Sequence, residues 1–337
     1  MYRVIFEGAN LIKMSLVTSA AMLAICLLAL VETTNTAEAK DSLPENGKIA
    51  FLSGDGNIYT VEPDGSNLSV LSPSGGGAPK WSPDGTEIIC PMCNASHSVI
   101  GHGSGDWPTY SADGTSVAVS EYRRLGGDYD IFMVDLATSK QTPLRRTPKL
   151  SETYVDFSPD GSQICFFNDD SDSGSSDLRG GKPMGVYVMD VKGSAPPRLL
   201  AEGSSGTCDW SPDGKKLVFN QYGAISIKNA DGSGRTALLT GKSAANVHPA
   251  WSPDGTKIVF SSNRDGGDYD IYTMDADGSD VAQLTNLPGD DEHPDWQPLP
   301  GTTVNPPDTG GPSLILVASA LLFSGGTLLY AGLRRSM

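Results

Sequence analysis

The sequence lacks an excess of positive charge. Among its 337 residues, 24 lysines and arginines stand against 40 aspartates and glutamates, which gives a formal net charge of −16. Nucleic-acid binding depends on cationic side chains that neutralise phosphates, so we expect no nucleic-acid partner. An acidic balance of this size is typical of a well-hydrated, soluble surface, with cation binding as the alternative interpretation.

The sequence also lacks the motifs of a serine hydrolase. No G-x-S-x-G nucleophile motif occurs, and no segment is long enough for an α/β-hydrolase domain. Histidine is scarce, and we expect its four occurrences in loops or at the starts of strands: His97, His102, His248 and His293. An enzyme that gathers acids and bases in one pocket remains an alternative, because a sequence does not show which side chains converge.

Cysteine is also infrequent, with five in the chain. Cys26 lies in an expected signal peptide, which leaves Cys90, Cys93, Cys165 and Cys208. Four cysteines in an exported chain allow three disulfide pairings. We favour Cys90 with Cys93, and Cys165 with Cys208, because the last two lie in adjacent repeats. A zinc site formed by Cys90, Cys93, His97 and His102 is one alternative, and free buried thiols are another.

The N-terminal segment has the features of an export signal. Lys13 precedes an apolar run from Ser15 to Val31, and Ala37-Glu38-Ala39 supplies the small residues of a cleavage site. We therefore expect residues 1–39 to be a signal peptide.

The C-terminal segment has the features of an anchor. Pro307-Asp308-Thr309-Gly310 lies in a linker, residues 299–313. The segment that follows, residues 314–337, consists of an apolar stretch from Leu314 to Leu333 and a basic tail with Arg334-Arg335. An apolar stretch of this length predicts a transmembrane helix with a basic cytoplasmic end. This order resembles the LPXTG-type cell-wall sorting signal of Gram-positive surface proteins, although Pro306 replaces the leucine. The resemblance implies that a sortase cleaves after Thr309 and joins it to the cell wall, and a simple membrane anchor is the alternative.

One short motif recurs between these segments. An aromatic residue followed by Ser-Pro-Asp-Gly, or by Ser-Ala-Asp-Gly in one copy, begins at Trp81, Tyr110, Phe157, Trp210 and Trp251, at spacings of 29 to 53 residues. Ser, Pro, Asp and Gly in this order favour a type I turn, so each motif predicts a hairpin between two strands. A third and a fourth strand follow in most copies. Four antiparallel strands in sequence are typical of a β-propeller blade.

The two ends of the repeat region are incomplete in complementary ways. Lys48 to Leu52 is typical of a second strand without a first, and His293 to Pro298 is typical of a first strand without a second. If the strand of Trp296 pairs with the strand that begins at Lys48, the ring closes without exposed sheet edges. We therefore predict an all-β, six-bladed propeller over residues 47–298.

The residues WSPDG, followed by KIVF and then by DYDIYTMDADG, occupy positions 251–278. They resemble the TolB-type β-propeller repeat. The resemblance implies a propeller fold, and propellers of this type serve as binding platforms, as gates on peptidases and as translocation partners.

Two sets of residues are candidate sites within the propeller. His248-Pro249 and His293-Pro294 recur just before innermost strands, where they are either part of the blade architecture or a ring of imidazoles lining one mouth of the channel. Asp265, Asp268 and Asp270 lie on a glycine-flexed loop, where they either bind structural calcium or cap the hairpin. We expect no other cofactor.

These features predict a monomeric, exported protein at the cell surface, anchored in the wall or the membrane. Its expected role is that of a non-catalytic binding module for a protein, a glycan or a wall polymer. The long loop from Asn168 to Pro183 is a candidate recognition element. One alternative is a carbohydrate-active or other hydrolase or lyase that uses the propeller funnel, and another is a structural or sensory spacer.

Overall fold

The computed structural model describes residues 46–73, 77–91, 105–123, 127–147, 150–169, 183–203, 206–242 and 244–299. The regular elements in these ranges are β-strands. These ranges contain no helix that is long and apolar enough to cross a membrane. The expected signal peptide, the sorting motif and the apolar stretch lie outside the described residues, as does the second compact unit of the chain, Pro306–Met337.

The repeated motif forms the hairpin turn that its residues predict. In the copy at Trp251, the Gly255 amide donates to the Ser252 carbonyl at 2.8 Å, and the Ser252 hydroxyl donates to Asp254 Oδ1 at 2.7 Å. Gly255 has a φ of +71°, in the left-handed region that glycine adopts without steric cost. The same glycine-to-serine hydrogen bond, also 2.8 Å, closes the turn in the other four copies.

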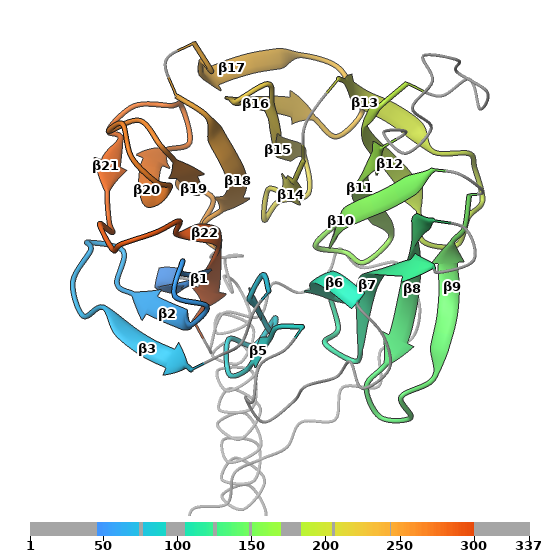
Figure 1. Cartoon of the computed structure of the whole chain (residues 1–337). Coiled ribbons are helices and arrows are strands. Elements are labelled where there is room, and N and C mark those ends of the chain that lie inside the picture. Colours follow the sequence, from blue (N-terminus) through green and yellow to red (C-terminus); the bar gives the residue numbers. More distant parts are fainter. Residues whose placement is uncertain are drawn as a thin grey trace, which may run out of the picture. The chain divides into compact units, whose positions relative to one another are not determined.

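Four blades consist of four consecutive antiparallel strands each, ordered from the channel outward (Figure 1). The first of these blades contains β6 (Gly105–Tyr110), β7 (Ser116–Arg123), β8 (Asp128–Asp135) and β9 (Gln141–Arg145), and the second contains β10 (Ser151–Phe157), β11 (Gln163–Asp169), β12 (Gly185–Asp190) and β13 (Arg198–Glu202). The third contains β14 (Cys208–Trp210), β15 (Lys216–Gln221), β16 (Ala224–Asn229) and β17 (Arg235–Leu239). The fourth contains β18 (Asn246–Trp251), β19 (Lys257–Ser262), β20 (Asp270–Asp275) and β21 (Ala282–Gln283).

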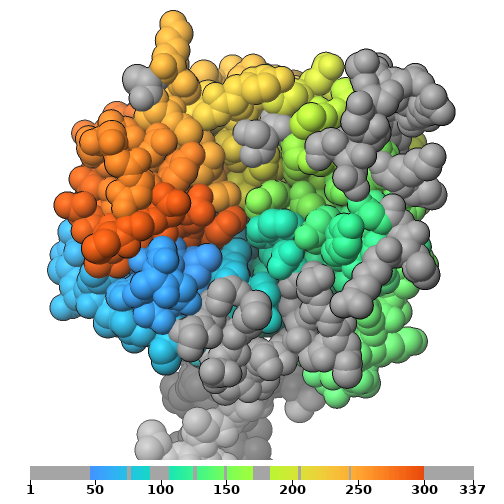
Figure 2. Space-filling view, viewed as in Figure 1, coloured from blue at the N-terminus to red at the C-terminus, as the bar shows by residue number. Residues whose placement is uncertain are grey.

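The fifth blade joins the two ends of the repeat region. Its order is β22 (Glu292–Pro298), β1 (Asn46–Leu52), β2 (Ile58–Val61) and β3 (Ser69–Ser72). Trp296 is paired directly with Ile49 in an antiparallel register, which confirms the predicted closure. The orange-red strand β22 accordingly lies beside the blue strand β1 (Figures 1 and 2).

The predicted number of six blades is wrong for the part of the chain that the structure describes. It contains five four-stranded blades, and the copy at Trp81 forms only a two-stranded sheet of β4 (Lys80–Trp81) and β5 (Ile88–Ile89). The spacing from Trp81 to Tyr110 is the shortest, at 29 residues. Residues 92–104 of this interval lie outside the described ranges. Strand β4 still contacts β22 and β6, so it holds the place of an inner strand.

The hydrophobic core lies between neighbouring blades. Trp296 and Phe51 of the closing blade, for example, pack with Val259 and Ile271 of the preceding one, and all four are nearly or fully buried. Burial of such side chains is the main favourable contribution to this fold.

A disulfide also joins two adjacent blades. Cys165 on β11 is bonded to Cys208 on β14, with Cα atoms 6.4 Å apart, which confirms the predicted pair. Cys90 is disulfide-bonded as well, and Cys93, its predicted partner, lies outside the described residues.

Candidate functional site

The central channel is lined by equivalent three-residue segments of the inner strands. Each segment ends one residue before an aromatic landmark of the repeat. The segments are Ala78-Pro79-Lys80, Trp107-Pro108-Thr109, Tyr154-Val155-Asp156, Thr207-Cys208-Asp209, His248-Pro249-Ala250 and His293-Pro294-Asp295. The first position of each segment lies near the start of its strand and the third lies deeper, so the channel has two layers of side chains.

Ring side chains occupy the first position in four of the six segments. Trp107, Tyr154, His248 and His293 all have a positive φ, between 51° and 55°. The strand register shifts at each of these residues, as in a β-bulge. A bulge in the left-handed region redirects the side chain, and here it turns four rings into one end of the channel. We call these four residues the aromatic mouth.

The rings of the aromatic mouth are in contact with one another. The Trp107 and Tyr154 ring centroids are 4.3 Å apart, those of His248 and His293 are 3.7 Å apart, and Tyr154 lies 6.3 Å from His293. The row of rings continues outward through Tyr129, whose centroid is 5.8 Å from that of Trp107. The structure therefore places two of the predicted histidines together at a channel mouth, while His97 and His102 lie outside the described residues.

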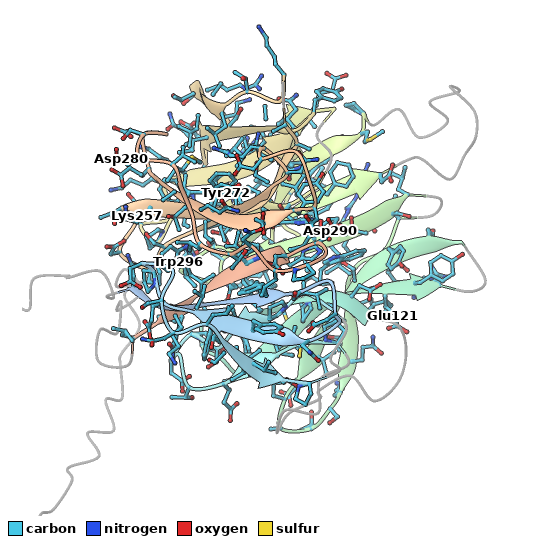
Figure 3. All side chains as sticks on the ribbon, turned by 60° about the vertical axis from the view of Figure 1, so that its left-hand side comes forward. Glu121, Lys257, Tyr272, Asp280, Asp290 and Trp296 are labelled. Carbon is cyan, nitrogen blue, oxygen red and sulfur yellow. A yellow bond between two sulfur atoms is a disulfide. The ribbon has the colours of Figure 1, made fainter. Side chains whose placement is uncertain are left out.

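Labelled residues in Figure 3 identify the two ends of the propeller, and with them the end at which the aromatic mouth lies. Lys257 and Asp280 lie at the end with the Ser-Pro-Asp-Gly turns, and Glu121 and Asp290 lie at the opposite end. The aromatic mouth belongs to the end of Asp290, because Asp290 lies two residues before the start of β22, the strand of His293.

Desolvation controls the protonation of the aromatic mouth. Burial lowers the pKa of His293 to about 4, and burial together with the neighbouring His293 lowers the pKa of His248 well below its usual value. Burial raises the pKa of Tyr154 to about 12, and the negative charges of Glu292 and Asp106 add to this effect. Both imidazoles and the phenol are therefore uncharged at neutral pH.

The deeper layer contains a cluster of charges that spans the channel. Lys80 Nζ lies 2.9 Å from Asp295 Oδ1, 3.3 Å from Asp209 Oδ1 and 3.6 Å from Asp156 Oδ1. The side chain of Lys80 is 25% exposed, and those of the three aspartates are 10 to 14% exposed. We call these four residues the Lys80 cluster. It forms a floor about 7 Å below the aromatic mouth, which is the rise of two strand residues.

The aspartates of the Lys80 cluster also connect neighbouring inner strands. Asp295 accepts a hydrogen bond from the Trp81 amide at 2.7 Å, and Asp209 accepts one from the Trp251 amide at 2.7 Å. Asp156 accepts from the Trp210 amide at 3.3 Å. Each carboxylate thus contacts the backbone of the next inner strand around the ring, which gives the channel a rigid wall.

Burial and charge act in opposite directions within the Lys80 cluster. Burial raises the pKa of Asp209 to about 7 and also raises that of Asp295, although the ammonium of Lys80 lowers both. Burial disfavours the charged form of Lys80, but the three carboxylates outweigh this effect and raise its pKa well above the usual value. Lys80 is therefore a fixed cation at neutral pH.

Sequence reasoning missed this cluster, although the sequence contained a signal for it. Aspartate immediately precedes the aromatic landmark at positions 156, 209 and 295, and lysine occupies the equivalent position 80. Equivalent positions in a propeller face the same channel at the same depth. The recurrence therefore implies that these side chains meet, once the ring is known to close.

The structure does not bring Asp265, Asp268 and Asp270 together as a metal site. Asp265 accepts from the Tyr272 hydroxyl, Asp268 accepts from the Gly289 amide, and Asp270 accepts from the Gln283 amide group at 3.0 Å. Among the described residues, no group of three or more histidine, cysteine, aspartate or glutamate side chains is arranged to hold a metal ion. The loop aspartates instead stabilise their own hairpin and its neighbours.

Other predicted residues lie outside the described ranges. They comprise the sorting residues Pro307, Asp308, Thr309 and Gly310, the cysteine and histidines of the alternative zinc site other than Cys90, and residues 170–182 of the candidate recognition loop.

Comparison with known proteins identifies the fold. No protein-family model matches the chain. The crystal structure of TolB from Acinetobacter baumannii aligns with a TM-score of 0.60 and 22% identity, over 76% of this chain and 68% of TolB. A protein described as TolB from Agrobacterium tumefaciens aligns with a TM-score of 0.55 and 21% identity, over 72% of this chain and 89% of that protein.

Two further proteins are similar over part of their length. Hydrazine synthase of Kuenenia stuttgartiensis aligns with a TM-score of 0.55 and 15% identity, over 79% of this chain and 49% of the synthase. An uncharacterized protein of Agrobacterium fabrum, Atu1656, is 27% identical over 231 residues, which are 55% of this chain and 76% of that protein. At these identities the likeness shows a TolB-type β-propeller fold.

Proposed function

We propose that this TolB-type propeller is a non-catalytic binding module that receives its ligand at the aromatic mouth. One observation carries the proposal: four ring side chains from four different inner strands converge above a charged cluster. Rings that gather at one end of a channel suit the docking of a surface group.

The aromatic mouth has the chemistry of a recognition surface. Trp107, Tyr154, His248 and His293 remain partly exposed despite their contacts. Aromatic side chains supply a large contact area and a polar edge, and they lose little conformational entropy when a ligand binds. Their positive φ values fix them further, because each ring is held by a bulge in a paired strand.

The protonation states favour binding over acid–base catalysis. A general acid or base at neutral pH needs a pKa near 7 and access to the substrate. The pKa of His293 is lowered to about 4, and the carboxylates of the Lys80 cluster are held by an ammonium and by backbone amides. Asp209, with a pKa raised to about 7, lies in the floor beneath the rings.

The cellular setting that we propose is the outer surface of the cell. The support is the sequence alone: an export signal in residues 1–39, and a sorting-like motif at Pro307 to Gly310 followed by an apolar stretch. In this setting the propeller presents its aromatic mouth to extracellular proteins or glycans. Mass spectrometry of the cell-wall and membrane fractions tests it: a mature C-terminus at Thr309 supports sortase processing, an intact tail supports a membrane anchor, and an unprocessed cytosolic chain contradicts both.

Binding to the aromatic mouth is tested with the full-length chain. Wild type and a Trp107→Ala/Tyr154→Ala variant are compared for capture of wall fragments, glycans and extracellular proteins. We expect the variant to lose at least about ten-fold in affinity for the captured ligand, since central aromatic residues carry much of the energy of an interface. Tyr222→Ala is the matched control, because Tyr222 is an exposed aromatic residue away from the channel (74% exposed). Equal loss in the control would contradict the proposal.

A further inference from the structure

Two carboxylates lie beside the aromatic mouth, on strands β6 and β22. Asp106 immediately precedes Trp107 on β6 and accepts a hydrogen bond from the Tyr129 hydroxyl at 3.3 Å. Glu292 immediately precedes His293 on β22, and its Oε1 lies 3.9 Å from His248 Nδ1. Both act on the same phenol, because the negative charges of Asp106 and Glu292 contribute to the raised pKa of Tyr154. Two acidic groups therefore lie near the Tyr154 ring.

Neither carboxylate has a basic side chain as a partner. Within the described residues, no ion pair joins a lysine or an arginine to Asp106 or Glu292. The imidazole next to Glu292 is uncharged at neutral pH because its burial lowers its pKa. Burial raises the pKa of both Asp106 and Glu292, the direction expected of carboxylates without a compensating cation.

The floor below the rings does not repel a cation. The floor contains one ammonium, that of Lys80, and three carboxylates, so it has more acidic than basic groups. The electrostatic field at the mouth is therefore dominated by acidic groups, in a protein whose formal net charge is −16.

Most ring pairs of the mouth are tilted against one another, whereas Tyr154 and His293 are closer to parallel, at 21°. The interplanar angle is 54° between Trp107 and Tyr129, 39° between Trp107 and Tyr154, and 30° between His248 and His293. A cation near the face of an aromatic ring is attracted by the ring quadrupole, and more strongly where water is excluded.

We propose that the aromatic mouth binds an arginine side chain presented by an extended segment of a partner protein. This inference rests on the proposed function and specifies the ligand class of the same site. The guanidinium stacks on the rings of Trp107 and Tyr154, and its N–H groups donate to the carboxylates of Asp106 and Glu292. Arginine suits this arrangement better than lysine, because its planar guanidinium both stacks on aromatic faces and donates in a fixed fork to carboxylates.

The test compares two synthetic peptides that differ only in charge. The probes are acetyl-Gly-Ser-Arg-Ser-Gly-amide and the same peptide with citrulline, a neutral analogue of arginine, and each is titrated against the full-length chain by ligand-observed NMR. We expect the arginine peptide to bind about ten-fold more tightly than the citrulline peptide. In an Asp106→Asn/Glu292→Gln variant, this preference falls to less than about two-fold.

The matched control removes two carboxylates at the other end of the propeller. A Glu62→Gln/Asp280→Asn variant has the same net charge as the test variant, and both of its residues flank the turns opposite the mouth. We expect it to keep the preference for arginine. An equal loss in the control would mean that net charge, rather than the mouth, attracts the peptide, and would overturn the inference. Circular dichroism of both variants checks that they are folded.

Two other outcomes also overturn the inference. The first is equal binding of the arginine and citrulline peptides. The second is binding of a glucosamine trimer, but not of the peptide, that depends on Asp106 and Glu292, because the partner is then a glycan. In either case the Trp107→Ala/Tyr154→Ala variant separates this failure from that of the proposed function. If this variant binds the captured ligand more weakly than the wild type does, the mouth is the binding site and only the proposed ligand class is wrong.

Discussion

Lys80 Nζ and Asp295 Oδ1 lie 2.9 Å apart, which joins the two-stranded sheet to the strand that closes the ring. The sheet of β4 and β5 contributes few buried apolar side chains of its own, among them Ile88 and Ile89. Its position in the ring therefore depends strongly on polar contacts with its neighbours. The ammonium of Lys80 and the Trp81 amide supply two of these, and both contact Asp295.

We expect Lys80→Met to destabilise the propeller by about 3–5 kcal/mol at pH 8, because it leaves three largely buried carboxylates without a cation. The folded-state pKa values of Asp209 and Asp295 then rise further above the unfolded value of 3.8. Groups with a raised folded pKa favour the folded state when protonated, so the defect should shrink as the pH falls towards 5. Urea denaturation at the two pH values measures the difference.

Lys257→Met is the control for this experiment. Lys257 lies 2.6 Å from Asp275, but the two side chains are 39% and 37% exposed. Exposed ion pairs contribute about 1 kcal/mol or less. A loss at Lys257 as large as that at Lys80 would contradict the role of the Lys80 cluster.

The turn of the two-stranded sheet approaches the closing strand closely. Gly85 has a φ of +68°, and a Cβ atom there would lie 1.8 Å from the Pro298 carbonyl oxygen. Gly266 has a φ of +87° with no atom near its Cβ position. Gly266→Ala should therefore cost about 1–2 kcal/mol of unfolding free energy through backbone strain alone. Gly85→Ala should cost roughly 2 kcal/mol more, because a backbone must move as well. Similar midpoints of denaturation for the two variants would show that this contact is absent.

The half-buried His293 predicts sensitivity to acid. Its pKa is lowered to about 4 by burial, whereas an unfolded histidine titrates near 6.5. Between these values the unfolded chain binds the additional proton, so acidification destabilises the fold by up to about 1.4 kcal/mol per pH unit for this residue. His293→Asn, which tolerates the positive φ, should flatten the plot of unfolding free energy against pH between 6.5 and 4. An unchanged slope would contradict the buried, neutral imidazole.

The disulfide between Cys165 and Cys208 should stabilise the contact between two blades. It closes a separation of 43 residues, for which the loss of unfolded-state entropy is worth about 4 kcal/mol. We expect Cys165→Ala/Cys208→Ala to lower the melting temperature measured by differential scanning calorimetry. A reducing agent should lower it in the wild type more than in the double variant. If reduction affects both equally, this bond does not contribute.

Local chemistry made much of the fold predictable. The Ser-Pro-Asp-Gly motif specifies its turn through the conformational preferences of proline and glycine, as the hydrogen bond from Gly255 to Ser252 shows. Alternating apolar residues predicted the strands that follow, such as Lys257 to Phe260. The pairing of Trp296 with Ile49 followed because each fragment lacked the strand that the other supplies. The pair Cys165 and Cys208 followed from their place in adjacent repeats.

The number of complete blades was not predictable from the landmarks. Trp81 and its turn have the same local preferences as the other copies, and its hairpin does form. Whether further strands join it depends on residues without a repeated pattern, so counting aromatic residues overestimated the four-stranded blades.

The sequence by itself determined the turns, the strands and the order in which they pair, because these depend on neighbours along the chain and on a repeated pattern. Only the tertiary structure decided which side chains share the channel. Lys80 and Asp209 are 129 positions apart, and Trp107, Tyr154, His248 and His293 come from four inner strands. Closure of the propeller ring and the bulges that turn the aromatic side chains inward determine which of these side chains meet in the channel. The shifted pKa values of these groups then follow from their burial.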